Sequence, residues 1–203
     1  MAKYTQSDHV LASHQALTHP GIFVGVTTNE IDVTTKLFGQ IYIYHANIEE
    51  TANVEGVRYA IQTSRLTSTD DDWLTAVEFR TDVAAAASEA MTATEAAGVK
   101  VLAVAAITGF VEGEYLYIQD TGALANSEWR WNDLLVASTS IDIIDGLTTG
   151  KDSSDVIFNK AEQFYAKVDF GGVKRVRLFV WHRAAAGSNL HFKADMTTTD
   201  SIG

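Results

Sequence analysis

Apolar and polar residues alternate along two separated groups of segments, as in β-strands with one buried and one solvated face. Between Val57 and Gln62, the odd positions are apolar and the even positions are mostly polar or small. Val176, Leu178 and Val180 likewise share one face. Asn, Asp, Gly and Ser turns separate these short segments, which is typical of a sandwich or barrel. The predicted strands are Gln40–Ala46, Val57–Thr63 and Trp73–Arg80 in the first group, and Phe164–Phe170, Val173–His182 and Leu190–Lys193 in the second.

The segment between the two groups, residues 84–154, has a different pattern. Its first part, up to Gly98, is rich in alanine, which favours a helix, although alternating small residues and threonines equally fit an extended linker or an edge strand. Gly109 and Gly113 then allow tight turns. The segment predicts short strands of its own, at Val101–Val104, Tyr115–Ile118, Trp129–Val136 and Ile141–Ile144.

This layout predicts an all-β, jelly-roll-like sandwich that is interrupted by a small inserted domain. Residues 21–83 and 155–203 together make the discontinuous sandwich. Residues 84–154 make the inserted β-barrel-like domain with its Ala-rich lead-in. Residues 1–20 show no clear alternation, and we interpret them as an N-terminal arm, either a docking element or a loosely ordered terminus.

Composition narrows the possible functions. The net charge of −11 and a pI of about 4.8 disfavour binding to nucleic acid or to anionic membranes, which need clustered Lys and Arg. The absence of cysteine excludes disulfides, thiolate catalysis and Cys-based zinc sites. Residues 1–20 lack the apolar core of a signal peptide, and no apolar run is long enough to span a bilayer. We therefore expect a soluble protein that is synthesised in the cytoplasm.

The histidines are the first candidates for chemistry. His9, His14 and His19 recur every five residues, a spacing that does not align metal ligands on a helix, so we interpret them as solvated side chains of the arm. His182 and His191 would face each other if the residues between them formed a hairpin loop. A metal would still need further ligands, which the sequence does not specify. We expect no metal site and no cofactor.

Enzyme signatures are also missing. The chain has no Gly-x-Ser-x-Gly elbow, no phosphate-binding loop and no dinucleotide fingerprint, so we expect no enzyme and assign no catalytic residue. Three aromatic pairs, Tyr42 with Tyr44, Tyr115 with Tyr117 and Trp129 with Trp131, are each spaced by two, so the two members of a pair project from the same sheet face. Such pairs stack on a sugar ring or fill a partner's pocket when exposed, and pack between sheets when buried. Tyr115, Tyr117, Trp129 and Trp131 are our candidate partner or glycan contacts.

Several of these segments resemble virion structural proteins of tailed bacteriophages. The run Val101–Val104, followed by Thr108–Phe110, Glu112–Glu114 and a Tyr-rich strand, is similar to a small β-module of such proteins. The flanking residues 161–164, 173–177 and 200–203 look like phage structural proteins of unassigned role. The resemblance covers about three quarters of the chain, counted over these segments and the strands between them. It consists of turns and strands without catalytic residues, so it transfers no functional site.

The resemblance implies a capsid-associated protein that is made in the host bacterial cytoplasm and located at the capsid surface of the virion. A major capsid protein is usually longer and carries a long helix. A head decoration or cement protein fits best, with the major capsid protein as its partner and a dimer or trimer as its oligomeric state. A tail or neck component and a receptor- or carbohydrate-binding β-sandwich module remain alternatives.

Overall fold

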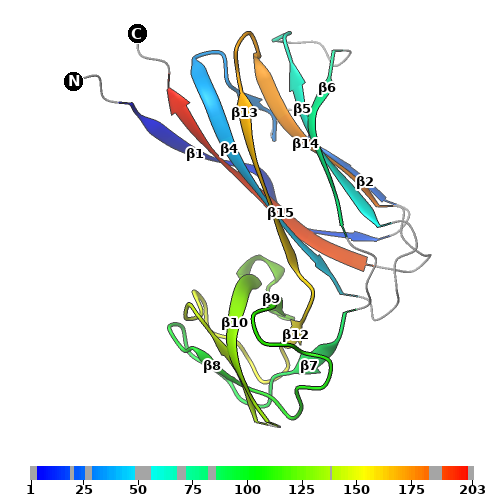
Figure 1. Cartoon of the computed structure of the whole chain (residues 1–203), viewed down its shortest axis with the longest axis vertical. Coiled ribbons are helices and arrows are strands. Elements are labelled where there is room, and N and C mark those ends of the chain that lie inside the picture. The colour runs from blue at the N-terminus through cyan, green and yellow to red at the C-terminus, as the bar shows by residue number, and fades with distance from the viewer. Residues whose placement is uncertain are drawn as a thin grey trace.

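The computed structural model describes residues 4–18, 21–25, 29–48, 56–67, 72–81, 86–137, 139–182 and 189–200. The predicted all-β class is confirmed: within these ranges the regular elements are β-strands and one 3-10 turn, η1 (Leu124–Asn126). The strands form a two-sheet sandwich and a third, curled sheet beneath it (Figure 1).

Two antiparallel sheets build the sandwich. The first has the order β1 (Gln6–Thr18), β15 (Asn189–Asp200), β4 (Lys36–Asn47) and β13 (Glu162–Asp169). The second has the order β2 (Gly21–Val24), β14 (Arg175–His182), β5 (Val57–Ser64) and β6 (Leu74–Arg80), and the short β3 (Ile31–Asp32) also pairs with β14.

The strand order is that of a jelly roll. If β3 and the inserted strands are set aside, the first strand pairs with the last (β1 with β15), and the second with the next to last (β2 with β14). The third and sixth strands, β4 and β13, pair in the same way, as do the fourth and fifth, β5 and β6. This is one long antiparallel hairpin rolled into two sheets. The hairpin turns back between β5 and β6, and the inserted domain enters at the next connection, between β6 and β13.

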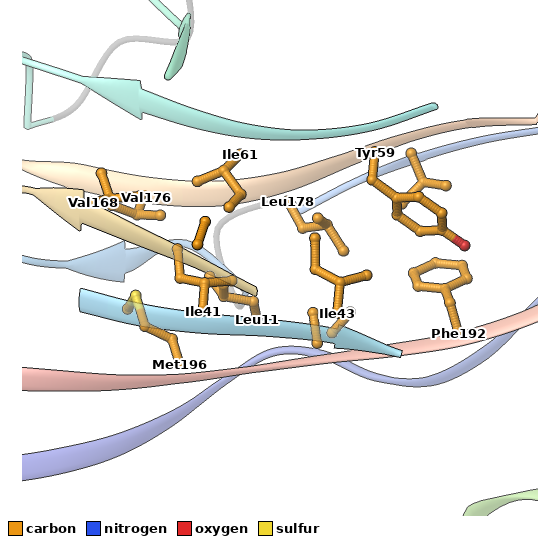
Figure 2. Close-up of a cluster of buried hydrophobic side chains, with 14 of the residues drawn as sticks. Leu11, Ile41, Ile43, Tyr59, Ile61, Val168, Val176, Leu178, Phe192 and Met196 are labelled. Atoms are coloured by element: carbon orange, nitrogen blue, oxygen red, sulfur yellow. The ribbon is translucent and has the colours of Figure 1, made fainter. Parts of the chain in front are cut away.

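The inner faces of the two sheets meet in one apolar core (Figure 2). The predicted alternation places every second residue of β4, β5 and β14 in this core, because successive side chains of a strand point to opposite faces. Its buried members include Leu11, Ile41, Ile43, Tyr59, Ile61, Val168, Val176, Leu178, Phe192 and Met196.

The N-terminal segment differs from the predicted arm. Residues 6–18 form strand β1, which pairs with β15 along its length and contributes Leu11 and Ala12 to the core. The register shifts between Val10 and Ala12 and again between Ala12 and Gln15. Each irregularity changes which side chain faces inward, so the strand shows no continuous period of two in the sequence.

The inserted domain is a six-stranded curled sheet. Its order is β7 (Ser88–Ala90), β12 (Val156–Phe158), β9 (Tyr115–Gln119), β10 (Glu128–Val136), β11 (Ser140–Ile143) and β8 (Val101–Ala103). An isolated β-bridge pairs Met91, just after β7, with Val104, just after β8. The two outer strands of the sheet therefore approach each other, and the sheet encloses its own apolar core. This is the predicted barrel-like portion.

The Ala-rich lead-in forms an edge strand at Ser88–Ala90, one of its two predicted alternatives, and is not helical where it is described; residues 82–85 lie outside the described ranges. The end of the insertion differs from the sequence prediction. Residues 156–158 form β12 and pair with β7 and β9, although the sequence pattern returns the chain to the sandwich at residue 155. The chain re-enters the sandwich at β13.

A third apolar cluster joins the sandwich to the insertion. Ala46 of β4 packs there with Tyr115, Tyr117 and Trp129 of the inserted sheet and with Phe158. The insertion therefore sits at one end of the sandwich, while β1 begins and β15 ends at the opposite end (Figure 1). The molecule is elongated, with a buried contact between its two parts, which we call the junction.

Candidate functional site

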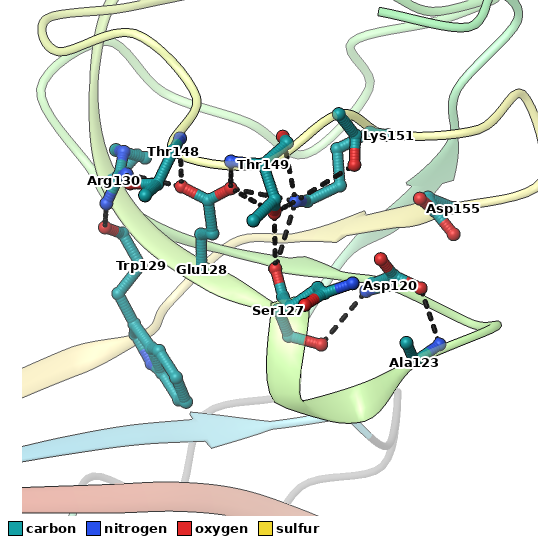
Figure 3. Close-up of polar contacts among 12 residues, drawn as sticks. Asp120, Ala123, Ser127, Glu128, Trp129, Arg130, Thr148, Thr149, Lys151 and Asp155 are labelled. Atoms are coloured by element: carbon teal, nitrogen blue, oxygen red, sulfur yellow. Dashed lines mark hydrogen bonds and ion pairs between the residues drawn. The ribbon is translucent and has the colours of Figure 1, made fainter. Parts of the chain in front are cut away.

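The four predicted contact residues lie side by side on one face of the β9–β10 hairpin. Trp129 pairs with Tyr117, and Trp131 pairs with Tyr115, in an antiparallel register that places all four side chains on the same face. That face is turned toward the sandwich, and Figure 3 shows the Trp129 side chain extending from β10 toward β4 and β15. The hairpin therefore contributes side chains both to the junction and to the lining of a surface pocket.

Burial separates the four residues into two groups. Tyr117 is fully buried and Trp129 is 4% exposed, so both serve the junction. The Trp129 indole N–H donates a hydrogen bond to the backbone carbonyl of His45, 3.1 Å away, and so fastens the insertion to β4. Trp131 is 48% exposed and stacks obliquely on Tyr115, with ring centroids 4.8 Å apart. A ligand reaches Trp131 directly, whereas it reaches Tyr117 only if the junction opens.

Two histidines surround Tyr117 inside the junction. The Tyr117 hydroxyl lies 2.6 Å from His191 Nδ1 and 3.0 Å from His14 Nε2, and those two nitrogens are 3.2 Å apart. A neutral imidazole nitrogen either donates one hydrogen bond or accepts one. We therefore assign the hydrogen bonds to the two contacts with the Tyr117 hydroxyl, and we describe the distance between the two histidine nitrogens as a close approach. Strands β1, β9 and β15 are thereby linked across the junction.

This placement corrects the sequence interpretation of the histidines. His14 is not a solvated side chain of an arm, because β1 carries it into the junction; His19 lies outside the described residues. His182 and His191 do not sit opposite each other, because β14 and β15 belong to different sheets. His182 is paired with Val57 and Gly21 in the second sheet.

Burial keeps the junction histidines neutral. It lowers the pKa of His14 to about 4. Burial, with the neighbouring His14, also lowers the pKa of His191 to about 4. His45, which contacts the Tyr59 hydroxyl at 2.7 Å, has its pKa lowered to about 3 by complete burial and by nearby His182. An uncompensated charge in such an environment is unfavourable, so each imidazole is neutral at neutral pH.

A pocket of about 420 Å³ opens beside Trp131, between the insertion and the sandwich. Its insertion side is formed by β10 and the segments next to it, including the exposed Asp145. Its sandwich side is formed by Tyr44, Gln163 and Lys193. Those three residues make one cross-strand row, because Tyr44 is paired with Gln163 on β13 and with Lys193 on β15. The pocket has the size and the interdomain position that are typical of small-molecule sites.

A buried ion cluster supports the insertion side of the pocket (Figure 3). The Lys151 ammonium has a fully buried side chain and donates to Glu128 at 2.8 Å and to the Thr149 hydroxyl at 2.6 Å. Arg130 forms a second ion pair with Glu128. Burial alone would raise the pKa of Glu128, but hydrogen bonds from Lys151 and from the backbone amides of Thr148 and Thr149 outweigh it and lower the pKa to about 2. The cluster joins two cations to one carboxylate and is fixed by these contacts, so it holds the pocket wall in place.

Lys193 is the ammonium group at the mouth of the pocket. It lies over the Tyr44 ring at 4.4 Å and is 3.6 Å from Asp195, beyond hydrogen-bond distance. Its side chain is 35% exposed. The sequence pattern does not single out Lys193 or Gln163, because a charged or polar residue on the solvated face of a strand is an ordinary feature of β-sandwiches. Only the junction makes them part of a pocket.

Some classes of site are absent from the part of the chain that the structure describes. Within it, His, Cys, Asp and Glu nowhere gather in a group of three or more that is suited to hold a metal ion. The same residues contain no helix with the length and hydropathy needed to span a membrane.

No protein-family model and no curated protein sequence matches the chain. Among solved structures, SPBc2 prophage-derived protein YomS is similar at 8% identity and a TM-score of 0.35, over 98% of this chain and 97% of that one. The K2 cleaved adhesin domain of Lys-gingipain is similar at 12% identity and a TM-score of 0.36, over 98% and 90%. VP17, a capsid protein of bacteriophage P23-77, is similar at 7% identity and a TM-score of 0.21, over 98% and 97%. Two of these three proteins come from a prophage or a bacteriophage. At these TM-scores the similarity is limited to the general arrangement of β-strands.

Proposed function

We propose that the protein is a non-enzymatic structural component of a tailed-phage virion, and specifically a head decoration protein. It would bind the outer surface of the capsid, with the major capsid protein as its partner, and stabilise contacts between neighbouring capsid proteins. The observation that carries this proposal is the rolled-hairpin strand order with a second domain inserted between its fifth and sixth strands, β6 and β13. Jelly rolls serve as shell-building and surface-recognition domains in viruses and lectins, and the insertion adds a second surface at one end.

The insertion offers a suitable contact face. Leu134 and Val101 flank Asp142 in one cross-strand row of the β10–β11–β8 sheet, and Val136 lies beside Ser140 in the next row. All three are exposed, at 47%, 50% and 41%. Exposed apolar side chains that gather on one sheet face are typical of protein contact sites. Many copies, each bridging two capsid proteins through a modest contact, together raise the cost of separating the shell.

The overall charge supports this role in a second way. A net charge of −11 makes free subunits repel one another, which keeps an abundantly produced protein dispersed before it attaches. We expect the assembled form to be a dimer or trimer, made in the host bacterial cytoplasm and then carried on the virion surface, with no nucleic acid or membrane as partner.

Labelling of virions tests the proposal. Particles purified from the source culture would be analysed by mass spectrometry and then labelled with gold-conjugated antibody against the protein. We expect the protein in the particles and the gold on the heads. Gold on the tail or neck would instead support the alternative that the protein is a tail or neck component, and absence from purified particles would overturn a virion role.

A charge substitution tests the contact face. Leu134→Asp should reduce attachment to particles stripped of the protein by about tenfold, because a buried, unpaired carboxylate is unfavourable at an interface. Leu74→Asp is the matched control, since Leu74 is 60% exposed on β6 of the sandwich. Equal attachment of both variants would show that the insertion face is not the contact.

The pocket beside Trp131 favours a second candidate, a receptor- or carbohydrate-binding module. An exposed indole, held at a fixed angle by Tyr115 and surrounded by polar side chains, is a binding arrangement that capsid attachment does not need. The two candidates are compatible, because the pocket and the Leu134 face involve different residues.

A further inference from the structure

The pocket continues onto an aromatic strip along the outer face of the first sheet. The row next to Tyr44 on β4 contains Tyr42, which is paired with Tyr165 on β13. The Tyr42 and Tyr165 ring centroids are 5.1 Å apart, and Tyr165 is 50% exposed. Aromatic rings therefore follow one another from Trp131 through Tyr44 to the Tyr42–Tyr165 pair. We call this set the aromatic strip.

The geometry of the strip selects the shape of its ligand. Successive rows of a strand on one face lie two residues apart, or roughly 7 Å. That spacing suits a linear chain of ring-shaped units, each of which lies on one platform. The end of the strip at the pocket is deeper and more polar, and the end at Tyr165 is an open surface, so the ligand is a chain whose terminal unit enters the pocket.

The chemistry of the strip selects a sugar. The electron-rich face of an indole or phenol ring attracts the weakly positive C–H bonds on one face of a pyranose, while the hydroxyl groups at the sugar's edge remain free for hydrogen bonds. Polar groups stand beside the rings to receive those hydroxyls: the Lys193 ammonium donates, the Asp145 carboxylate accepts, and the Gln163 amide does both.

The charge balance at the pocket also admits an acidic sugar. The lining includes Arg130 and Lys193 with Glu128 and Asp145, so it is balanced, although the chain as a whole carries −11. Glu128 is already neutralised by Lys151 and Arg130. The Lys193 ammonium lies 3.6 Å from Asp195 and shares the pocket lining with Asp145, so it can donate to sugar hydroxyls and to sugar carboxylates alike.

We propose that the pocket and the aromatic strip form one extended binding site for a linear oligosaccharide, with one sugar ring on Trp131, the next unit beside Tyr44 and Lys193, and a further unit on the Tyr42–Tyr165 pair. This site rests on the carbohydrate-binding candidate above and specifies its ligand. It does not depend on the structural role, because the Leu134 face of the insertion involves other residues.

Binding to defined oligosaccharides tests the site. The full chain would be applied to an array of neutral and uronic-acid oligosaccharides of one to six units, and each sugar that binds would be titrated by calorimetry. We expect affinity to rise with length from one to three units and then to level off. Absence of binding to every oligosaccharide on the array at millimolar concentration would overturn the proposal.

Three variants assign the binding to this site. Trp131→Ala should weaken binding of every sugar at least tenfold. Tyr165→Ala should weaken trisaccharides and longer chains but leave the monosaccharide unchanged. Lys193→Met should weaken binding of every sugar several-fold, because it removes a hydrogen-bond donor beside the rings.

Matched controls separate this result from a general loss of structure. Tyr4→Ala removes an aromatic that is 59% exposed and outside the strip, and Lys100→Met removes an exposed ammonium of the insertion. Both should bind like the original chain, and all five variants should keep its thermal midpoint within a few degrees. Binding that survives Trp131→Ala, or that is equally lost in Tyr4→Ala, would contradict the proposed site. Capsid attachment is measured separately with Leu134→Asp, so failure of one proposal leaves the other intact.

Discussion

Lys151 shows how much one side chain contributes to the insertion. Its ammonium is enclosed and donates to Glu128, to Thr149 and to the backbone carbonyl of Asn126 at 2.9 Å. The cost of removing a charge from water is offset here by a carboxylate at 2.8 Å and by neutral acceptors. The surrounding sequence, Thr148 to Ser154, is uniformly polar and resembles an exposed turn, so no local pattern predicts a buried cation.

Removing this ammonium should be costly. We expect Lys151→Met to lower the free energy of unfolding by about 3 kcal/mol, because Glu128 then loses a close partner in a buried place. Urea denaturation measures the change. The control Lys100→Met removes an ammonium whose one described hydrogen bond is at the surface, and it should change stability by less than about 0.5 kcal/mol. A loss for Lys151→Met no larger than for Lys100→Met would show that the cluster does not stabilise the fold.

At the scale of elements, the first and last strands of the sandwich each bring a histidine to the junction. His14 comes from β1 and His191 from β15, and the pKa of each is lowered by burial. Their spacing in the sequence carries no sign of this meeting, since residues 14 and 191 lie at opposite ends of the chain. The rolled hairpin pairs its first strand with its last and so brings them together.

This arrangement predicts a loss of stability in mild acid. In the unfolded chain the histidines take up protons near pH 6.5, whereas in the folded chain two of them do so only near pH 4. Between these values the unfolded state binds more protons, so stability is full above about pH 6.5 and falls as the pH drops toward 4. We expect the thermal midpoint to fall by roughly 5 °C between about pH 7 and pH 5.

A series of thermal melts at different pH values checks this expectation. The variant His14→Gln with His191→Gln should show a smaller decline between pH 6.5 and 5, because two of the groups that titrate are gone. From pH 7 to pH 8 both proteins should have constant midpoints, which serves as the internal control. An equally steep decline in the double variant would assign the acid sensitivity to other groups.

At the scale of the whole molecule, the junction decides whether the two parts behave as one body. It buries Tyr117 and Trp129 against the sandwich, and the Trp129 indole N–H donates to the His45 carbonyl. Each part also has its own apolar core, so each retains much of its stability without the other. The junction is therefore the connection through which unfolding of one part affects the other.

Trp129→Ala should uncouple the two parts. We expect it to lower the free energy of unfolding by about 4 kcal/mol, because it leaves a cavity and an unpaired carbonyl. In calorimetry, the single transition of the original chain should separate into two. Trp131→Ala is the matched control, since that indole is half exposed, and its melt should keep one transition. A single, merely shifted transition in Trp129→Ala would mean that other contacts couple the parts.

The sequence by itself determined the class of the fold, most of the strands and the interruption between them. These features are local, because alternation of side chains with a period of two requires only one buried and one wet face per strand. The same rule placed Trp129 and Trp131 on one face. It did not find β1, whose two irregularities disrupt the period, nor β12, which is too short to show one.

Only the tertiary structure decided which strands pair and what meets at the junction. Pairing of β1 with β15 joins residues from the two ends of the chain, and local patterning contains no information about partners that distant. For the same reason the burial of His14, the buried Lys151 cation and the separation of Tyr117 from the exposed Trp131 could not be predicted. The candidate site is formed by side chains of both parts, so it exists only once the insertion has packed against the sandwich.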